Sequence, residues 1–340
     1  MFLRKFRSIV YNMPILERDP WRLQYFEGSC CPDDVMIPVD DPDCWMLYPD
    51  HCWIYDKLRI AKSQGLDCAP HGVMPVQYPV FSKPIYNLKG MGVGGRPIYS
   101  RKEMLEFSQP GHMWMPLLTG EHVSSDCAVV DGEIRWIRHA TGLATTGGMF
   151  HYWIIHAASN PRIEIYLRNW VSKHMRGYTG MMNFESIGSH IIEAHLRFAD
   201  QWCDLYGHGW IEALINLYAM KTWTFDDHPT ADGFSIPLFA QHGFQYFHPS
   251  AESQATVLAM NNVSSLQITF YETSDPASHP MPPGGFRLAI INATDLDAGL
   301  TARENLSECF PSEQLLESRL PSSNGSPQSD FQIGSTPTKV

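Results

Sequence analysis

Apolar and polar residues alternate along the chain with two different spacings, which predict a mixture of strands and helices. Short apolar runs and every-second-residue patterns predict strands, whereas apolar residues three or four positions apart predict helices. The predicted strands cover 78–86, 112–118, 122–130, 133–140, 180–188, 190–198, 234–240, 265–271 and 286–293. The predicted helices cover 53–66, 100–108, 162–177 and 199–220. Helices packed on antiparallel strands make an α+β layered fold.

Turn residues indicate how two pairs of these strands are connected. Asp131-Gly132 lies between the strands at 122–130 and 133–140, and Gly188-Ser189 separates those at 180–188 and 190–198. Dipeptides of this kind are typical of tight hairpin turns. We therefore expect each pair to form an antiparallel hairpin.

The composition changes along the chain and suggests four parts. Residues 1–50 form a short, turn-rich N-terminal segment, and 51–205 carry most of the long periodic patterns. Residues 206–308 read as a C-terminal helix and sheet-containing subdomain. Residues 309–340 are rich in Ser, Pro and Gly with few core formers, so we expect them to be disordered.

Composition and charge narrow the class of protein. The chain has 340 residues, 44% of them hydrophobic, and a formal net charge of -11 at pH 7. This acidic balance argues against a general affinity for nucleic acid, and no apolar run approaches the ~18 residues of a membrane-spanning helix. The first residues lack the apolar stretch of a secretory signal, and the eight cysteines include no C-x-x-C pair. We expect a cytoplasmic protein without a membrane partner; the sequence leaves its oligomeric state open.

A glycine-rich stretch after one predicted strand suggests an anion-binding loop. Lys83 ends the strand, and Gly90, Gly92, Gly94 and Gly95 follow it. Glycines let backbone N–H groups approach an anion closely, and Lys83 could reach the same anion as a point charge. The spacing is not that of the G-x-x-x-x-G-K-S/T loop. The alternative is a flexible hairpin with an incidental lysine.

Carboxylates near the Gly188-Ser189 turn suggest a metal site. Glu185 and Glu193 lie on adjoining strands, and His195 shares the strand face of Glu193. Magnesium takes oxygen ligands and usually shares them with substrate phosphates. The alternative is a hairpin with solvated glutamates. A nucleoside triphosphate between this hairpin and the glycine-rich loop would account for both.

Four segments in order carry a resemblance to a known family. They are YDKLRIAKSQGLDCAP, YPVFSKPIYNLKGMGVGG, LLTGEHVSSDCAVVDGE and GMMNFESIGSHIIEAHLRF. Together they resemble the ATP-grasp superfamily over about residues 50–205, and the second is similar to the loop of the carbamoyl phosphate synthetase large chain. The resemblance implies an ATP-grasp fold, in which two α+β subdomains clasp a nucleotide, followed here by the C-terminal extension.

The resemblance also implies roles for the matching residues. Lys57 and Lys83 would bind the nucleotide phosphates, and Gly90, Met91 and Gly92 would lie in the closing loop. Met115 and Leu117 belong to the stretch that would contact adenine. Glu121 and His122 would also contact the nucleotide, beside the matching residues Gly120, Ser124 and Asp126. His122 stands where the family usually has glutamate. The implied metal ligands are Glu185, Glu193 and His195, with His195 replacing an asparagine. Arg197 matches an arginine that contacts phosphate or acyl phosphate, and Lys83 assists it.

The function that the resemblance implies is that of an ATP-dependent ligase. Such an enzyme activates a small-molecule or peptide carboxylate as an acyl phosphate, which an amine or similar nucleophile attacks, with Mg²⁺ or Mn²⁺ as cofactor. Two alternatives stay open: an inactive nucleotide-binding module, which the unusual His122, Pro116 and His195 favour, and a small-molecule kinase on the same scaffold.

A further segment could complete the substrate site. Arg138 could clamp a substrate carboxylate. Residues 145–148, Thr-Thr-Gly-Gly, could form a second anion-binding loop. The alternative is an ordinary strand end and turn.

Overall fold

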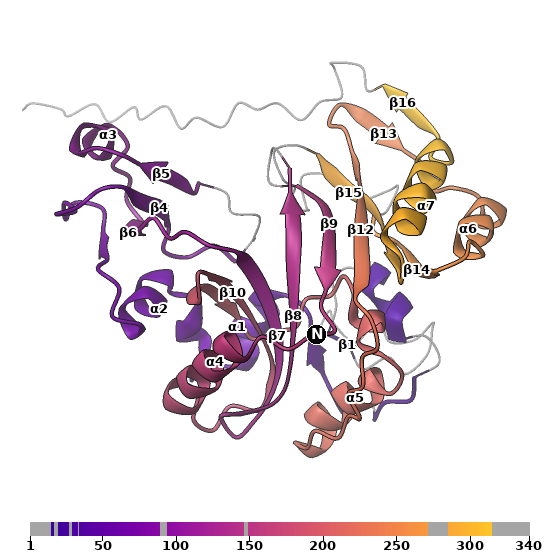
Figure 1. The fold of residues 1–340 in the computed structure, drawn as a ribbon, viewed down its shortest axis with the longest axis horizontal. Coiled ribbons are helices and arrows are strands. Elements are labelled where there is room, and N and C mark those ends of the chain that lie inside the picture. Colours follow the sequence, from indigo (N-terminus) through magenta and orange to yellow (C-terminus); the bar gives the residue numbers. More distant parts are fainter. Residues whose placement is uncertain are drawn as a thin grey trace, which may run out of the picture.

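The computed structural model describes residues 15–16, 20–26, 29–32, 34–88, 94–145, 149–270 and 285–314. Its centre is an antiparallel eight-stranded sheet with the strand order β11-β10-β7-β8-β9-β12-β15-β14 (Figure 1). These strands are β7 (His122–Val130), β8 (Glu133–Ala144), β9 (Phe150–Ile155), β10 (Gly180–Ile187), β11 (His190–His195), β12 (Gly233–Ala240), β14 (Val263–Ile268) and β15 (Phe286–Ala293).

A second sheet, called here the small sheet, has four strands in the order β3-β6-β4-β5. They are β3 (Ala69–Pro70), β4 (Val80–Pro84), β5 (Arg96–Ile98) and β6 (His112–Pro116). One face of the small sheet packs on α3 (Arg101–Glu106) through Ile98, Met104 and Trp114. The other face packs on α2 (Lys57–Ser63) through Ala61, Met113 and Met115. Helix α2 therefore lies between the small sheet and the large one.

The remaining elements surround the large sheet (Figure 1). The helices are α1 (Asp41–Leu47), α4 (Pro161–His174), α5 (Trp210–Met220), α6 (Ala251–Leu258) and α7 (Leu296–Glu308), with 3-10 turns η2 (Pro20–Phe26), η3 (Cys52–Tyr55) and η5 (Cys203–Tyr206). Two short strand pairs join β1 (Ile15–Leu16) to β2 (Ile37–Pro38), and β13 (Phe244–Tyr246) to β16 (Ser312–Gln314). Helices α6 and α7 lie at the end of the molecule opposite the small sheet.

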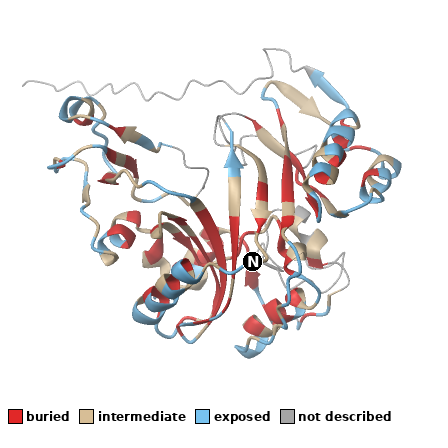
Figure 2. Ribbon diagram, viewed as in Figure 1, coloured by how far each residue is buried: buried red, intermediate tan, exposed pale blue. Residues whose placement is uncertain are grey.

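Different helices pack on the two faces of the large sheet. On one face, called the α4 face, Leu167 and Trp170 of α4 pack with Cys127 and Phe184. On the other, called the α5 face, helix α5 packs on a second cluster of strand residues that includes Trp136. The buried residues run through the strands between these layers (Figure 2). Because successive side chains point to opposite faces of a strand, Glu185, next to Phe184, belongs to the α5 face.

The predicted α+β architecture and both predicted hairpins are confirmed. Asp131 and Gly132 have φ values of 50° and 75°, and Gly188 and Ser189 have φ values of 56° and 71°. Two successive positive φ values are the signature of the tight turn that suits a hairpin. Strand β7 pairs with β8, and β10 pairs with β11, as expected.

Two predicted helices are wrong in extent. The helix predicted at 53–66 is interrupted at Asp56, whose side chain accepts a hydrogen bond from the backbone of Arg59 and so begins α2. The helix predicted at 199–220 is split between η5 and α5, because Gly207 and Gly209 adopt positive φ values of 115° and 88°. In both places the apolar pattern continues across the point where the helix is interrupted, so the pattern alone predicts one continuous helix.

The second half of the chain continues the large sheet. Strand β12 pairs with β9, and β15 and β14 follow, so residues 206–308 share one sheet with 51–205. The proposed division between these parts stays a prediction. Most of the predicted disordered tail lies outside the described residues, and its early residues Ser312–Gln314 form β16. No helix in the described ranges combines the length and the apolar character needed to cross a bilayer.

Candidate functional site

Five charged or titratable side chains meet where α2 and the small sheet touch the edge of the large sheet. We call them the junction cluster: Lys57, Lys83, His122, Glu185 and Glu193. Lys57 Nζ lies 2.6 Å from Glu193 Oε1, and His122 Nε2 lies 3.3 Å from Glu185 Oε2. Lys83 Nζ donates a 2.6 Å hydrogen bond to the carbonyl oxygen of Ile192, next to Glu193. The structure thus brings together the lysines and the acidic hairpin that the sequence places far apart.

Local structure explains why these side chains converge. Glu185 and Glu193 are direct cross-strand partners in β10 and β11, so both carboxylates lie on the α5 face. Lys57 is the first residue of α2, and its backbone N–H donates to the carbonyl of Ile85 just after β4, the strand that carries Lys83. This bond fixes the two lysines next to each other.

Burial and neighbouring charges shift the pKa values within the cluster. Burial lowers the pKa of Lys83 to about 8, with Glu193 opposing and Lys57 adding to the shift. Burial alone would raise the pKa of Glu185, but the neighbouring imidazole of His122 holds that pKa below its usual range. The carboxylate of Glu185 in turn raises the pKa of His122 against the effect of burial. Glu185 is therefore ionised at neutral pH, in an ion pair with His122 when that imidazole is protonated.

A second group, called the Asp41 triad, consists of Asp41, His195 and Arg197. Asp41 begins α1 and is 4% exposed. His195 Nδ1 lies 2.9 Å from Asp41 Oδ2, and Arg197 Nε lies 3.0 Å from Asp41 Oδ1. Burial alone would raise the pKa of Asp41, but Arg197 and His195 hold it well below its usual range. Two predicted site residues are thus fixed by a carboxylate from the N-terminal segment.

The Asp41 triad adjoins the junction cluster, since His195 Nε2 lies 3.9 Å from Glu193 Oε1. Asp41 is a residue that sequence reasoning missed. It lies in the run Asp40-Asp41-Pro42-Asp43, within the N-terminal segment that the sequence predicts to be turn-rich. In the structure Asp40 is the N-cap of α1, where its side chain accepts a hydrogen bond from the backbone of Asp43.

A row of buried polar side chains, called the polar row, crosses the α5 face beside the cluster. His195, Asn183, Asp126 and Arg138 are successive cross-strand partners from β11 to β8. Asn183 Nδ2 donates to Asp126 Oδ1 at 2.7 Å, and the backbone of Ala199 donates to both oxygens of Asp126. The hydroxyl of Tyr206 donates a 2.5 Å hydrogen bond to Asp126 Oδ2. Even so, burial raises the pKa of Asp126 to about 6.

Arg138, the predicted substrate clamp, binds a carboxylate of the chain itself. Its guanidinium pairs with Asp227, whose other oxygen accepts a 2.6 Å hydrogen bond from Trp136 Nε1. The arginine is 6% exposed. Arg138 thus binds a carboxylate, as predicted for a clamp, but this carboxylate belongs to Asp227 of the same chain. A role for Arg138 toward a substrate stays a prediction.

The stretch predicted to contact adenine, with Met115 and Leu117, lies in and just after β6 of the small sheet. The side chain of Met115 is buried against α2, and the backbone N–H of Leu117 donates to Pro79. Gly120 lies against the hairpin turn, where an added Cβ would come within 2.9 Å of Gly188 Cα. Glu121 is exposed. The predicted loop residues Gly90, Met91, Gly92, Thr146, Gly147 and Gly148 lie outside the described residues.

The carboxylate pair suits magnesium, although no preformed three-ligand metal site exists among the residues that the structure describes. Glu185 and Glu193 supply oxygen donors on one face and stay 32% and 20% exposed. Magnesium commonly takes one or two protein carboxylates and completes its shell with phosphate oxygens and water. His195 suits it less well, because magnesium prefers oxygen ligands to an imidazole nitrogen.

Comparison with known proteins shows the fold. No protein-family model and no curated protein sequence matches the chain. The chain is similar in structure to the L-amino acid ligase of Bacillus licheniformis, with a TM-score of 0.57 and 11% identity over 87% of this chain and 84% of that one. It is also similar to the phosphoribosylamine–glycine ligase of Thermotoga maritima, with a TM-score of 0.59 and 12% identity over 86% of both chains.

A third similar structure contains a nucleotide. It is the N5-carboxyaminoimidazole synthase of Aspergillus clavatus in complex with ADP and 5-aminoimidazole ribonucleotide, with a TM-score of 0.55 and 9% identity over 81% of each chain. The structural neighbours are ATP-grasp ligases, so the chain has the ATP-grasp fold that its motifs predict.

Proposed function

We propose that the chain is an ATP-dependent ligase that activates a carboxylate as an acyl phosphate and transfers the acyl group to an amine. The observation that carries this proposal is the convergence of Lys57 and Lys83 with Glu185 and Glu193 at the junction of the two sheets. Phosphoryl transfer needs mainly positioning and stabilisation of charge. Cations from one side and metal-binding carboxylates from the other provide both.

Lys57 and Lys83 would bind the phosphates of ATP. Both side chains are buried, so their charges act in a medium of lower dielectric than water. An incoming triphosphate would exchange with the present partners, Glu193 and the carbonyl of Ile192. Glu193, released from Lys57, would then hold Mg²⁺ together with Glu185, which is 32% exposed beside His122. The ion would neutralise phosphate charge when bound.

The first chemical step joins the substrate carboxylate to phosphorus. A carboxylate oxygen attacks the γ-phosphorus, the bond from that phosphorus to the β–γ bridging oxygen breaks, and ADP leaves with the electron pair. A carboxylate is already a nucleophile, so this step needs no base. Arg197, held by Asp41 on the same sheet face, would orient toward the transferring group.

The second step forms the product. The amine nitrogen attacks the acyl carbon, the carbon–oxygen bond to phosphate breaks, and inorganic phosphate leaves while the nitrogen loses a proton. The identity of the acid and of the amine depends on loops that differ widely between proteins of one fold.

The test measures ADP release from ATP with a panel of carboxylic acids and amines. We expect release that needs both an acid and an amine and that stops in the Glu193→Gln variant, with its melting temperature close to that of the wild type. The matched control is Glu106→Gln, an exposed carboxylate on α3 that should change nothing. Full activity of Glu193→Gln would remove the metal assignment.

A second candidate function is a nucleotide-binding module without turnover. It is favoured because the charged side chains of the junction cluster already have partners within the chain. In particular, His122, which stands where the resemblance expects a glutamate, pairs with Glu185. Titration of ADP and ATP by calorimetry distinguishes the two functions. Binding without ADP release under any pair of substrates would support the module and overturn the ligase.

A further inference from the structure

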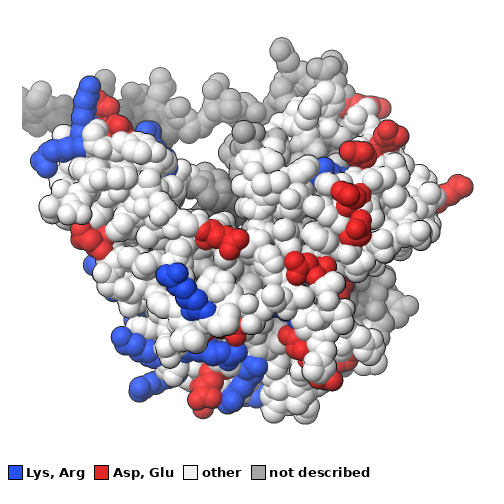
Figure 3. Space-filling view, in the orientation of Figure 1, with Lys and Arg blue, Asp and Glu red and all other residues white. Residues whose placement is uncertain are grey.

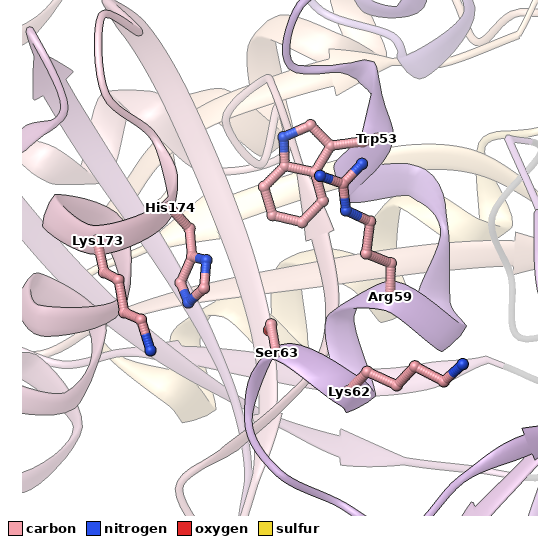
Figure 4. A pocket seen from close by; sticks show the side chains of 6 residues that line it. All are labelled: Trp53, Arg59, Lys62, Ser63, Lys173 and His174. Carbon is pink, nitrogen blue, oxygen red and sulfur yellow. The ribbon is translucent and has the colours of Figure 1, made fainter.

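A hollow between α2 and α4 lies apart from the junction cluster. Its volume is about 440 Å³, and its lining residues are Trp53, Arg59, Lys62, Ser63, Lys173 and His174 (Figure 4). We call it the α2–α4 pocket. The two helices are joined at its base, because Trp170 Nε1 donates a 2.9 Å hydrogen bond to Ser63 Oγ. Ligand-binding pockets commonly have volumes of about 300–1,000 Å³.

The large sheet separates this pocket from the proposed nucleotide site. Trp170 of α4 packs on Phe184, with ring centroids 5.6 Å apart, on the α4 face. Glu185, the next residue, points to the α5 face. A ligand in the pocket would therefore occupy a site distinct from that of the nucleotide.

The lining of the pocket is strongly cationic in a protein with a net charge of -11. It contains one arginine, two lysines and a histidine but no acidic side chain. Among the described residues, Arg59, Lys62 and Lys173 make no ion pair. Burial lowers the pKa of His174, and the charges of Lys173 and Arg59 add to the shift. On the face that Figure 3 shows, Lys and Arg side chains also gather over α4.

Helix stabilisation explains only part of this charge. Lys62 lies in the last turn of α2, and Lys173 and His174 lie in the last turn of α4, where positive charge offsets the helix dipole. Arg59 lies in the first turn of α2, where the dipole disfavours a cation. Its guanidinium instead stacks on Trp53, 4.3 Å from the ring centroid, at the pocket wall. Arg59 therefore lies against Trp53 at one wall of the pocket (Figure 4).

We infer that the α2–α4 pocket binds a small metabolite carrying two or more phosphate charges. Arg59 and Lys62 would hold it from α2, and Lys173 from α4. The ring of His174 adds a polar contact. Phosphate is the anion for which several cations around one small cavity are best suited.

The test is calorimetric titration of inorganic pyrophosphate into the full chain. The key variant is Lys62→Gln/Lys173→Gln, and the matched control is Lys102→Gln, an exposed lysine on α3. We expect the double variant to bind pyrophosphate about 10-fold or more weakly, since charge-assisted contacts to two lysines are lost. The control should bind like the wild type. Melting temperatures check that each variant is folded.

Pyrophosphate could also enter the nucleotide site, so Lys83→Gln is titrated in parallel. Binding that survives Lys83→Gln but is lost in the double variant supports the pocket. The inference is overturned if the wild type binds no pyrophosphate at millimolar concentration, if the double variant binds as tightly as the wild type, or if only Lys83→Gln abolishes binding. The test measures binding of pyrophosphate rather than turnover, so its outcome does not depend on whether the chain is a ligase.

Discussion

The junction cluster and the polar row lie side by side on the α5 face, yet their ions are held in different ways. In the cluster, Glu185 and Glu193 each face one main cation and stay partly exposed. In the row, Asp126 is 2% exposed and accepts hydrogen bonds from three groups, and the adjoining Asp41 is held by two cations.

We infer from this difference that the cluster is the binding site and that the row and the triad support it. An ion with one partner at a partly open edge can exchange that partner for a ligand at little cost. A buried carboxylate with several donors cannot lose them without leaving polar groups unsatisfied. We therefore expect substitutions in the row and the triad to act on folding, and substitutions in the cluster to act on binding.

The largest effect on stability is expected from Asp41→Ala. It leaves Arg197 and His195 buried without their carboxylate, which should lower the free energy of unfolding by about 3–5 kcal/mol. Urea unfolding measures the loss. Asp40→Ala is the matched control, since it removes only the N-cap of α1 and should cost about 1 kcal/mol. Equal losses in the two variants would show that Asp41 acts only through its helix.

Asp126→Ala should have the next largest effect, about 2–3 kcal/mol, because Asn183, Ala199 and Tyr206 lose their acceptor. Asp126→Asn keeps one acceptor oxygen and should lose less.

The pH dependence provides a second check on Asp126. Its folded pKa of about 6 lies above its usual value, so the native state binds this proton more tightly than the unfolded state does. The stability that this gives is present at low pH and is lost as the pH rises through 6. The wild type should therefore gain stability relative to Asp126→Asn between pH 7 and pH 4. A difference that is constant across this range would contradict the shifted pKa.

The sequence predicted features that depend on neighbours along the chain. The pairing of Glu185 with Glu193 followed from one turn of two residues, and the strand at 286–293 was predicted with its observed bounds. Helix α7 was missed because its buried face consists of Gly299, Ala302 and Leu306, which give a weak apolar pattern. Gly299 is needed there, since a Cβ would lie 2.4 Å from Ile236 Cδ1.

Two contacts between distant parts of the chain could not be predicted. Asp41 meets His195 from 154 residues away, and Asp227 reaches Arg138 from an irregular segment after α5. Neither pair leaves a periodic or motif signal. The motifs predict which residues form the candidate site, but the groups that hold Arg138, His195 and Arg197 in place appear only in the folded chain.

Lys83→Gln should leave folding nearly intact and weaken nucleotide binding. The lysine makes one hydrogen bond to a backbone carbonyl, which glutamine can also donate to, but the positive charge is lost. We expect the affinity for ATP to fall about 10-fold, which corresponds to about 1.4 kcal/mol. Titration of ATP checks this, with Lys102→Gln as the charge control. A large loss of stability with unchanged affinity would place Lys83 with the supporting residues instead.

A small effect on stability is expected from His122→Gln. Its pair with Glu185 is about one third exposed, so its loss should change the free energy of unfolding by only about 0.5–1 kcal/mol. Exposed ion pairs are screened by salt, whereas enclosed hydrogen bonds are not. The difference between His122→Gln and the wild type should therefore shrink from low to 1 M salt, while the difference for Asp126→Asn should persist. If both differences respond to salt alike, the two groups of residues are not distinguished by exposure, and the division between site and support fails.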